Sequence, residues 1–288
     1  MVIESLTDLF QTRELRFSKR YISITSETRF KKQPVIFIMG ATGTGKSRLA
    51  VDIATKYSGE IINSDKMQVF KGLDIVTNKI TEHEKKGVPH HMLGHIDPDY
   101  EYTAQDFCYD ALAFIRRVGR SGKLPVIAGG SNSFIEKLVE DPLFGFLSKY
   151  ECCFIWLDVS VPVLYSYVQR RVDQMVIEGL VDEVGGIFKP NADYTKGIRK
   201  SIGVPELENY LQAETEVNNK TAENLLQVAI SDIKSNTCKL TDSQISKICR
   251  LKDELMWPIN RVDATKVFKK RGKEAAAAWE EQINSPFS

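Results

Sequence analysis

Residues 35–47 read VIFIMGATGTGKS, and this stretch decides the fold. Its first five residues are apolar and end at a glycine, which predicts a short buried strand. Residues 40–47 match the pattern G-x-x-x-x-G-K-[ST], in which glycines let backbone amides turn toward phosphate oxygens while the following helix adds positive charge at its N-terminus. The stretch therefore predicts a phosphate-binding loop (P-loop) formed by Gly40, Ala41, Thr42, Gly43, Thr44, Gly45, Lys46 and Ser47. Within it, Lys46 supplies a full positive charge and the Ser47 hydroxyl can hold Mg²⁺.

Beyond this loop, short apolar runs alternate with helical patterns. Further strands are predicted at residues 60–63, 124–128 and 152–159. Apolar spacing predicts helices at residues 47–57, 103–120, 134–139 and 162–188, the last with a break near Gly179 or Gly185. The alternation predicts an α/β protein with a P-loop-type three-layer fold and a mainly parallel central sheet.

The two ends of the chain differ from this middle part. Residues 1–33 are rich in Lys, Arg, Ser and Thr with four acidic interruptions, so we expect a loosely ordered leader, with a targeting remnant as the alternative. From Lys220 onward no strand pattern is clear, and helices are expected at 221–238, 241–255 and 273–282. We therefore predict a P-loop α/β catalytic domain at 34–215 and a helical C-terminal portion at 216–288, packed on the core.

Composition excludes several classes of protein. The 288 residues include 39 Lys+Arg and 38 Asp+Glu, and this balance argues against a dedicated nucleic-acid binder. A hydrophobic content of 42% is that of a globular protein rather than of a fibrous or disordered one. None of the five cysteines forms a C-x-x-C pair, so reduced thiols in an intracellular protein are expected. No apolar run has membrane-spanning length, and we expect a monomer without membrane contact.

A P-loop does not by itself distinguish a kinase from other enzymes that bind diphosphates. Nucleoside triphosphatases usually carry an acidic residue at the end of a later strand, where it organises Mg²⁺. Here the predicted strand at 124–128 is followed by two glycines and no acidic residue. Asp158 is a candidate for that acid, or else a solvated or capping carboxylate. Asp65 follows the strand at 60–63, at the sheet edge where ligands bind in such folds, and its alternative is a helix cap.

Several ordered motifs carry a resemblance to a known family. They lie at residues 40–47, 64–75, 89–93, 102–107, 124–131, 171–180 and 199–203. Together they resemble the isopentenyl (dimethylallyl) transferases that modify adenine, over roughly residues 35 to 210. The likeness is greatest to the plant adenylate isopentenyltransferases of cytokinin synthesis, because only residues 140–151 stand where tRNA-modifying members insert a helical domain.

The resemblance implies transfer of a dimethylallyl group from its diphosphate to the exocyclic amine of adenine in free ATP or ADP, with AMP used less. It implies Asp65 as the general base, Thr42 beside the bridging oxygen of the donor and Arg171 on its diphosphate, which the P-loop and Mg²⁺ also bind. The alternatives are a small-molecule or nucleotide kinase and, second, a tRNA dimethylallyltransferase. We expect no tRNA substrate, and a plastid or cytosolic location stays open.

The acceptor side of the predicted site is less defined. Ser131 and Asn132 are candidates for the acceptor channel, or they cap a helix, and Arg199 is either a phosphate contact or a surface charge. A basic cluster near the C-terminus either attracts the acceptor's outer phosphates or forms a solvated helix face. It comprises Lys266, Lys269, Lys270, Arg271 and Lys273.

Overall fold

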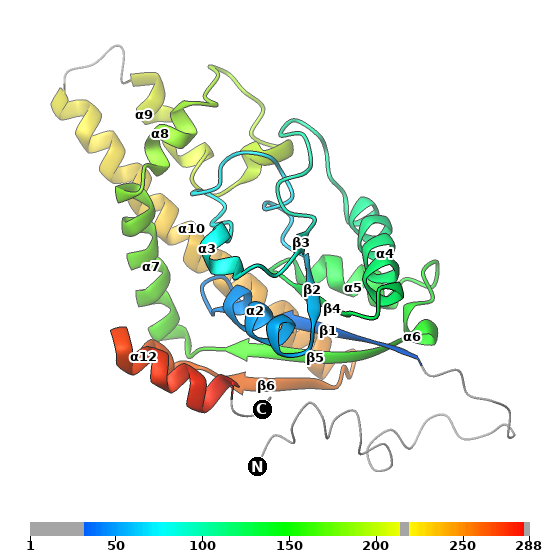
Figure 1. Cartoon of the computed structure of the whole chain (residues 1–288). Helices are drawn as coiled ribbons and strands as arrows, with labels where there is room; N and C mark the ends of the chain where they lie inside the picture. The colour runs from blue at the N-terminus through cyan, green and yellow to red at the C-terminus, as the bar shows by residue number, and fades with distance from the viewer. Residues whose placement is uncertain (1–31, 214–218, 285–288) are drawn as a thin grey trace, which may run out of the picture.

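The computed structural model describes residues 32–213 and 219–284 (Figure 1). Nearly all of the predicted leader, and the predicted boundary between residues 215 and 216, lie outside the described residues. Both therefore stay predictions.

A six-stranded parallel sheet forms the centre of the molecule. Its strands are β1 (Gln33–Met39), β2 (Gly59–Asn63), β3 (His90–His91), β4 (Leu124–Ala128), β5 (Tyr150–Asp158) and β6 (Ile259–Asp263), in the order β3-β2-β4-β1-β5-β6. The strand that precedes the P-loop is thus in the interior of the sheet. The predicted α/β fold with a parallel sheet is confirmed.

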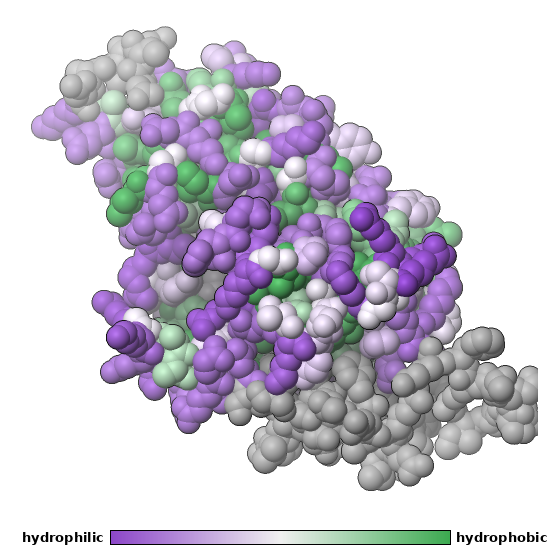
Figure 2. All heavy atoms as spheres, in the orientation of Figure 1, coloured by the Kyte–Doolittle hydropathy of each residue, from purple (hydrophilic) through white to green (hydrophobic). Residues whose placement is uncertain are grey.

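Helices cover both faces of this sheet and give three layers (Figure 1). Ile36 and Ile38 point to one face, where the apolar core includes α2 (Lys46–Lys56), α7 (Val161–Ile177), α11 (Thr265–Phe268) and α12 (Gly272–Trp279). Val35, Phe37 and Met39 alternate to the other face and pack with α4 (Ala104–Arg120), α5 (Asn132–Glu140), α6 (Phe146–Lys149) and the C-terminal part of α10 (Asn219–Asp253). Hydrophilic residues cover most of the face shown in Figure 2.

A third apolar cluster lies beyond the carboxyl ends of the strands. Its helical members come from α7, α8 (Leu180–Gly185), α9 (Glu208–Ala213), the 3-10 turns at Gly197–Lys200 and Pro205–Leu207, and the first part of α10. Val69, Phe70, Leu73 and Val76 join it from the segment that follows β2. The short helix α3 (Glu82–Lys85) and strand β3, neither of them predicted, come next in the chain.

The C-terminal portion differs from expectation in two ways. Its strand β6 was not predicted, because among INRVD only Val262 is buried and the others lack the apolar pattern of a strand. Residues 219–253 form a single helix rather than two, and its Thr237 and Thr241 hydroxyls bond carbonyls one turn back, at Ile233 and Thr237. The last predicted helix is confirmed as α12, followed by a π-helical turn at Glu280–Asn284.

Candidate active site

The P-loop connects β1 to α2 and is packed against the C-terminal helix α12. Gly45 has φ +91°, and a Cβ there would lie 2.9 Å from the ring of Trp279, so glycine is needed for both reasons. The Trp279 indole is buried and its Nε1 donates to Asp52 Oδ2 on α2 at 2.8 Å. Helix α12 therefore packs against the P-loop through the Trp279 ring.

The guanidinium of Arg171 reaches the P-loop from α7. Its Nη2 donates to Thr42 Oγ1 at 2.8 Å, while its Nε is buried without a hydrogen-bond partner among the described residues. Burial lowers the pKa of Arg171 from its ordinary value, and Tyr167 and Asp65 oppose this shift. A charged group held in this way, with an unused donor, is suited to an anionic ligand such as a diphosphate.

Lys46 is the second cation at the loop, and its side chain is partly buried. Its Nζ donates to the carbonyl of Ala41 at 2.7 Å, within the loop itself. Burial lowers the pKa of Lys46 to about 8; the nearby Asp65 carboxylate raises it, and Arg171 lowers it further. Lys46 thus changes charge just above neutral pH when the site holds no anion.

The pKa of Lys46 predicts that kcat/KM for an anionic donor falls at alkaline pH. Above a pH of about 8 the free enzyme loses the Lys46 proton, so kcat/KM for a diphosphate substrate should fall tenfold per pH unit. The measurement is a profile of kcat/KM from pH 6.5 to about 9.5 for the wild type and for Lys46→Arg. The arginine stays charged, so the variant should lack this decrease. A wild-type profile flat to pH 9.5 would contradict the role given to Lys46.

Asp65 follows β2 and has a fixed orientation. Its Oδ1 accepts from the amides of Met67 at 2.9 Å and Gln68 at 3.4 Å, and its own amide donates to Asn63 Oδ1 at 3.1 Å. Oδ2 has no hydrogen-bond partner in the described part of the chain and lies near Gly130. Asp65 therefore caps a turn with one oxygen and leaves the other free.

The glycines after β4 allow this approach. A Cβ on Gly129 would lie 2.3 Å from the carbonyl carbon of Ser64 and 2.6 Å from the amide nitrogen of Asp65. Any side chain at this position would push the Asp65 turn away from the sheet edge. Gly129 thus sets the distance between the end of β4 and the carboxylate.

A cavity of about 1220 Å³ brings these groups together. Thr42, Gly43, Gly45, Lys46, Ser47, Asp65 and Arg171 all line it. Apolar side chains, among them Ile75, Met175 and Phe268, complete its wall. Pockets for a single small ligand have about 300–1,000 Å³, so this one has room for two substrates side by side.

Three predicted acceptor residues do not line this cavity. The Ser131 hydroxyl accepts from the Lys66 amide at 2.9 Å, and the buried Asn132 Nδ2 donates to the Gln244 carbonyl at 3.2 Å. Arg199 is paired with Asp99. Their assignment as acceptor ligands stays a prediction.

The basic cluster near the C-terminus is divided. Lys270 and Arg271, in the connection between α11 and α12, line the cavity, whereas Lys266, Lys269 and Lys273 do not. Two of the five charges are therefore placed where they can meet a ligand.

Gln244 of α10 is a site residue that sequence reasoning missed. Its Oε1 accepts from the Thr42 amide at 2.7 Å and its Nε2 donates to the Gly130 carbonyl at 3.0 Å, so one amide links the P-loop to the end of β4. Gln244 is only 7% exposed. A glutamine on a helix with mixed polarity gives no local signal of such a role.

The structure places Asp158 away from the cavity. This carboxylate is 8% exposed and forms an ion pair with Arg261 of β6 at 2.6 Å. Within residues 32–213 and 219–284, no group of three or more His, Cys, Asp or Glu side chains could hold a metal ion.

A divalent metal nevertheless fits the P-loop. Prenyl transfer from diphosphates generally uses such a metal, and Mg²⁺ is usually bound by one or two protein groups together with waters and substrate phosphates. The Ser47 side chain lines the cavity and forms no hydrogen bond within the described residues. One hydroxyl beside a diphosphate is a sufficient protein contribution.

In the described residues, no helix has the length and apolar character needed to cross a membrane.

The parallel sheet, the P-loop and the carboxylate opposite it define a P-loop transferase. The model of the IPP transferase family matches residues 68–146 and 140–248, and the chain belongs to this family. It is 50% identical over 285 residues to adenylate isopentenyltransferase 5, chloroplastic, of Arabidopsis thaliana, covering 98% of this chain and 86% of that protein. It is 47% identical to the mitochondrial adenylate isopentenyltransferase 7 of the same plant, covering 98% and 87%, and 40% identical to adenylate isopentenyltransferase of Humulus lupulus, covering 86% of each.

Solved structures share the fold at lower identity. A eukaryotic dimethylallyltransferase acting on tRNA has a TM-score of 0.73 at 23% identity, covering 88% of this chain and 77% of that one. The tRNA isopentenylpyrophosphate transferase of Bacillus halodurans has a TM-score of 0.65 at 24% identity, covering 89% and 100%. These likenesses concern the fold alone.

Proposed function

We propose that this protein transfers the dimethylallyl group of dimethylallyl diphosphate to the exocyclic amine of adenine in free ATP or ADP, using AMP less, in cytokinin biosynthesis. One observation carries the proposal. The free oxygen of Asp65 and the Arg171–Thr42 pair line one cavity, in a chain 50% identical to a plant adenylate isopentenyltransferase.

The donor's diphosphate binds at the P-loop. Backbone amides of residues 43–47 and the Lys46 ammonium surround it, and Arg171 adds a planar fork of donors. Thr42 donates to the oxygen between the allylic carbon and phosphorus, since the Arg171 contact leaves its hydroxyl proton free to do so. These groups stabilise the charge that grows on pyrophosphate as it departs.

The acceptor's amine meets the allylic carbon from the Asp65 side of the cavity. A C–N bond forms as the C–O bond breaks, and pyrophosphate leaves with the electron pair of that bond. The amine is a poor nucleophile because its lone pair is delocalised into the ring. Asp65 takes the amine proton on Oδ2, the oxygen that its turn leaves free.

Mg²⁺ is the divalent metal that we propose, held by the Ser47 hydroxyl and the donor's diphosphate. It supplies positive charge against the leaving group.

The outer phosphates of the acceptor extend toward Lys270 and Arg271. Both line the cavity on the side of α11 and α12, and the acceptor's β- and γ-phosphates give such cations more to bind than AMP does. This contact is the physical basis of the proposed preference for ATP and ADP.

A competition experiment tests the acceptor. With equal concentrations of ATP, ADP, AMP and unmodified tRNA and with labelled donor, label should appear mainly on ATP and ADP. In a Lys270→Ala/Arg271→Ala double variant the ratio of ATP to AMP use should fall about tenfold, because two phosphate contacts are lost. Lys269→Ala, a neighbouring lysine outside the cavity wall, is the matched control and should keep the wild-type ratio.

Other outcomes of this experiment would contradict parts of the proposal. Label mainly on tRNA overturns the acceptor assignment. Label mainly on AMP, or an unchanged ratio in the double variant, rejects the role of Lys270 and Arg271. Transfer of the γ-phosphate of ATP in place of prenyl transfer makes the protein a kinase.

A further inference from the structure

The loop of residues 65–79, here called the 65–79 loop, begins at Asp65 and forms one wall of the cavity. It contributes Asp65, Gln68, Asp74, Ile75, Thr77, Asn78 and Lys79 to the lining. The loop therefore carries both the carboxylate and part of the cavity wall.

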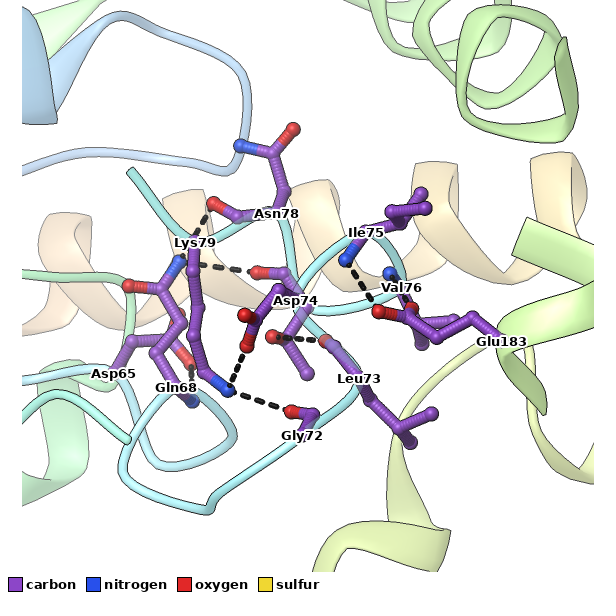
Figure 3. Close-up of polar contacts among 11 residues, drawn as sticks. Asp65, Gln68, Gly72, Leu73, Asp74, Ile75, Val76, Asn78, Lys79 and Glu183 are labelled. Atoms are coloured by element: carbon purple, nitrogen blue, oxygen red, sulfur yellow. Dashed lines mark hydrogen bonds and ion pairs between the residues drawn. The ribbon is translucent and has the colours of Figure 1, made fainter. Parts of the chain in front are cut away.

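Its own side chains hold this loop in one shape (Figure 3). Gln68 Nε2 donates to the carbonyls of Thr77 at 3.0 Å and Asn78 at 3.1 Å, which closes the loop across its base. Lys79 Nζ donates to the Gly72 carbonyl at 2.6 Å and to Asp74 Oδ1 at 2.7 Å. Because the backbone amide of Gln68 also donates to Asp65 Oδ1 at 3.4 Å, these bonds couple residues 77 and 78 to the carboxylate.

Contacts from outside fix the two halves of the loop differently. The first half is bonded to residues 94–96, with the amides of Gly94 and Lys71 donating to Gln68 and Ile96 carbonyls, each at 2.9 Å. The second half, residues 72–79, has a single polar anchor elsewhere in the described chain. Both oxygens of Glu183 accept from consecutive amides, of Ile75 at 3.0 Å and of Val76 at 2.8 Å (Figure 3).

Glu183 belongs to the same helical unit as the donor-side arginine. It lies on α8, which follows α7 after Gly179, and α7 carries Arg171. Leu73 and Val76 of the loop pack in the same apolar cluster as Val172 and Leu180, the residues next to Arg171 and Gly179. The apolar contacts keep the loop against α7 and α8. The two hydrogen bonds from Glu183 fix where residues 75 and 76 lie along these helices.

We propose that Glu183 is a positioning residue that aligns Asp65 with the Arg171–Thr42 pair, so that the base meets the acceptor's amine in line with the departing diphosphate. This inference rests on the proposed role of Asp65 as general base. Glu183 contacts neither substrate; it acts through the backbone of Ile75 and Val76.

A carboxylate is the side chain that this position requires. Two adjacent N–H groups need two acceptors, and charge-assisted bonds to a carboxylate are about twice as strong as neutral ones. Glutamine offers one acceptor oxygen and turns its NH₂ toward the second amide. A misplacement of about 1 Å can lower a rate about a hundredfold, so the loss of this anchor should reduce turnover.

The experiment compares Glu183→Gln and Glu183→Ala with Asp182→Asn. Asp182 is the adjacent acidic residue on α8, with an exposed side chain that forms no hydrogen bond within the described residues. At saturating ATP and donor, and well below the melting temperature, kcat should fall about tenfold for Glu183→Gln and about a hundredfold for Glu183→Ala. KM for the donor should stay within about twofold, because the P-loop is untouched, and Asp182→Asn should match the wild type.

A double-mutant cycle separates positioning from a general loss of structure. In an Asp65→Asn background, Glu183→Ala should lower the residual kcat less than about threefold, because the group that it positions is already gone. An equal loss in both backgrounds, or a normal kcat for Glu183→Gln, overturns this inference. A wild type without transferase activity overturns the proposed function instead.

Discussion

Replacing Asp65 with asparagine is expected to lower kcat for prenyl transfer by roughly a hundred- to ten-thousand-fold, the range of a general base. The variant isolates the proton transfer because the amide keeps an oxygen at Oδ1, which accepts from Met67 and Gln68 and holds the turn. Only Oδ2 becomes an NH₂ group, which cannot take a proton at neutral pH. Product mass measured in single-turnover and steady-state assays gives the rate, and calorimetry with ATP shows whether acceptor binding persists.

Asp97→Asn is the matched control for this change. Its Oδ1 likewise accepts a backbone amide, that of Asp99 at 3.0 Å, and the residue lies outside the cavity wall. The control should keep wild-type turnover. If Asp65→Asn kept it too, Asp65 would have no part in the chemical step.

Removing either of the two partly buried cations, Lys46 or Arg171, should lower kcat/KM for the donor by about two to three orders of magnitude, the cost of losing one stabiliser of a growing oxyanion. Lys46→Ala and Arg171→Ala each remove one positive charge that faces the donor's diphosphate. Arg171→Ala also removes the 2.8 Å contact between Arg171 and Thr42. Binding of ATP should weaken much less, since the proposed arrangement places its adenine beside Asp65 and its outer phosphates near Lys270 and Arg271. Steady-state kinetics with varied donor, and ATP titrations, measure the two effects separately.

Arg170→Ala provides a comparison on the same helix. Arg170 also lines the cavity but does not contact Thr42, so its removal changes the net charge without the specific contact, and the loss should be smaller. If ATP binding collapsed in Lys46→Ala while donor binding survived, the P-loop would hold the nucleotide, and the kinase alternative would replace the prenyl transferase.

The interior of the fold could be predicted because its signals are local. β1, β2, β4 and β5 are mostly buried strands, and each was expected within two residues of its observed bounds. The break in the helical segment after α7 was placed correctly, because Gly179 has φ +103°, a conformation that glycine adopts without strain. Thr42, Lys46 and Asp65 line one cavity because they follow the carboxyl ends of β1 and β2 at one edge of the parallel sheet, and Arg171 reaches it from α7.

Features that depend on distant partners could not be predicted. Strand β6 is a polar edge strand whose pairing with β5 is visible only in three dimensions. Gln244 and Glu183 form hydrogen bonds with backbone groups more than 100 positions away, and nothing in their own surroundings in the sequence indicates this. Ser131 and Asn132 sit beside the site in the sequence, but their side chains bond to Lys66 and Gln244 instead of lining the cavity.

The order of protein synthesis determines when the contact between Trp279 and the P-loop can form. Translation delivers the N-terminal part first, yet Trp279 bonds to Asp52 across 227 positions and Gln244 to Thr42 across 202. A nascent chain that has just completed its P-loop motif therefore still lacks the contacts that Gln244 and Trp279 make with the loop and with α2. A premature stop codon after residue 253 would preserve every motif that marks the family while deleting β6 and Trp279. A truncated gene of that kind would still look intact to a motif search, but its product would lack the support beneath the phosphate site.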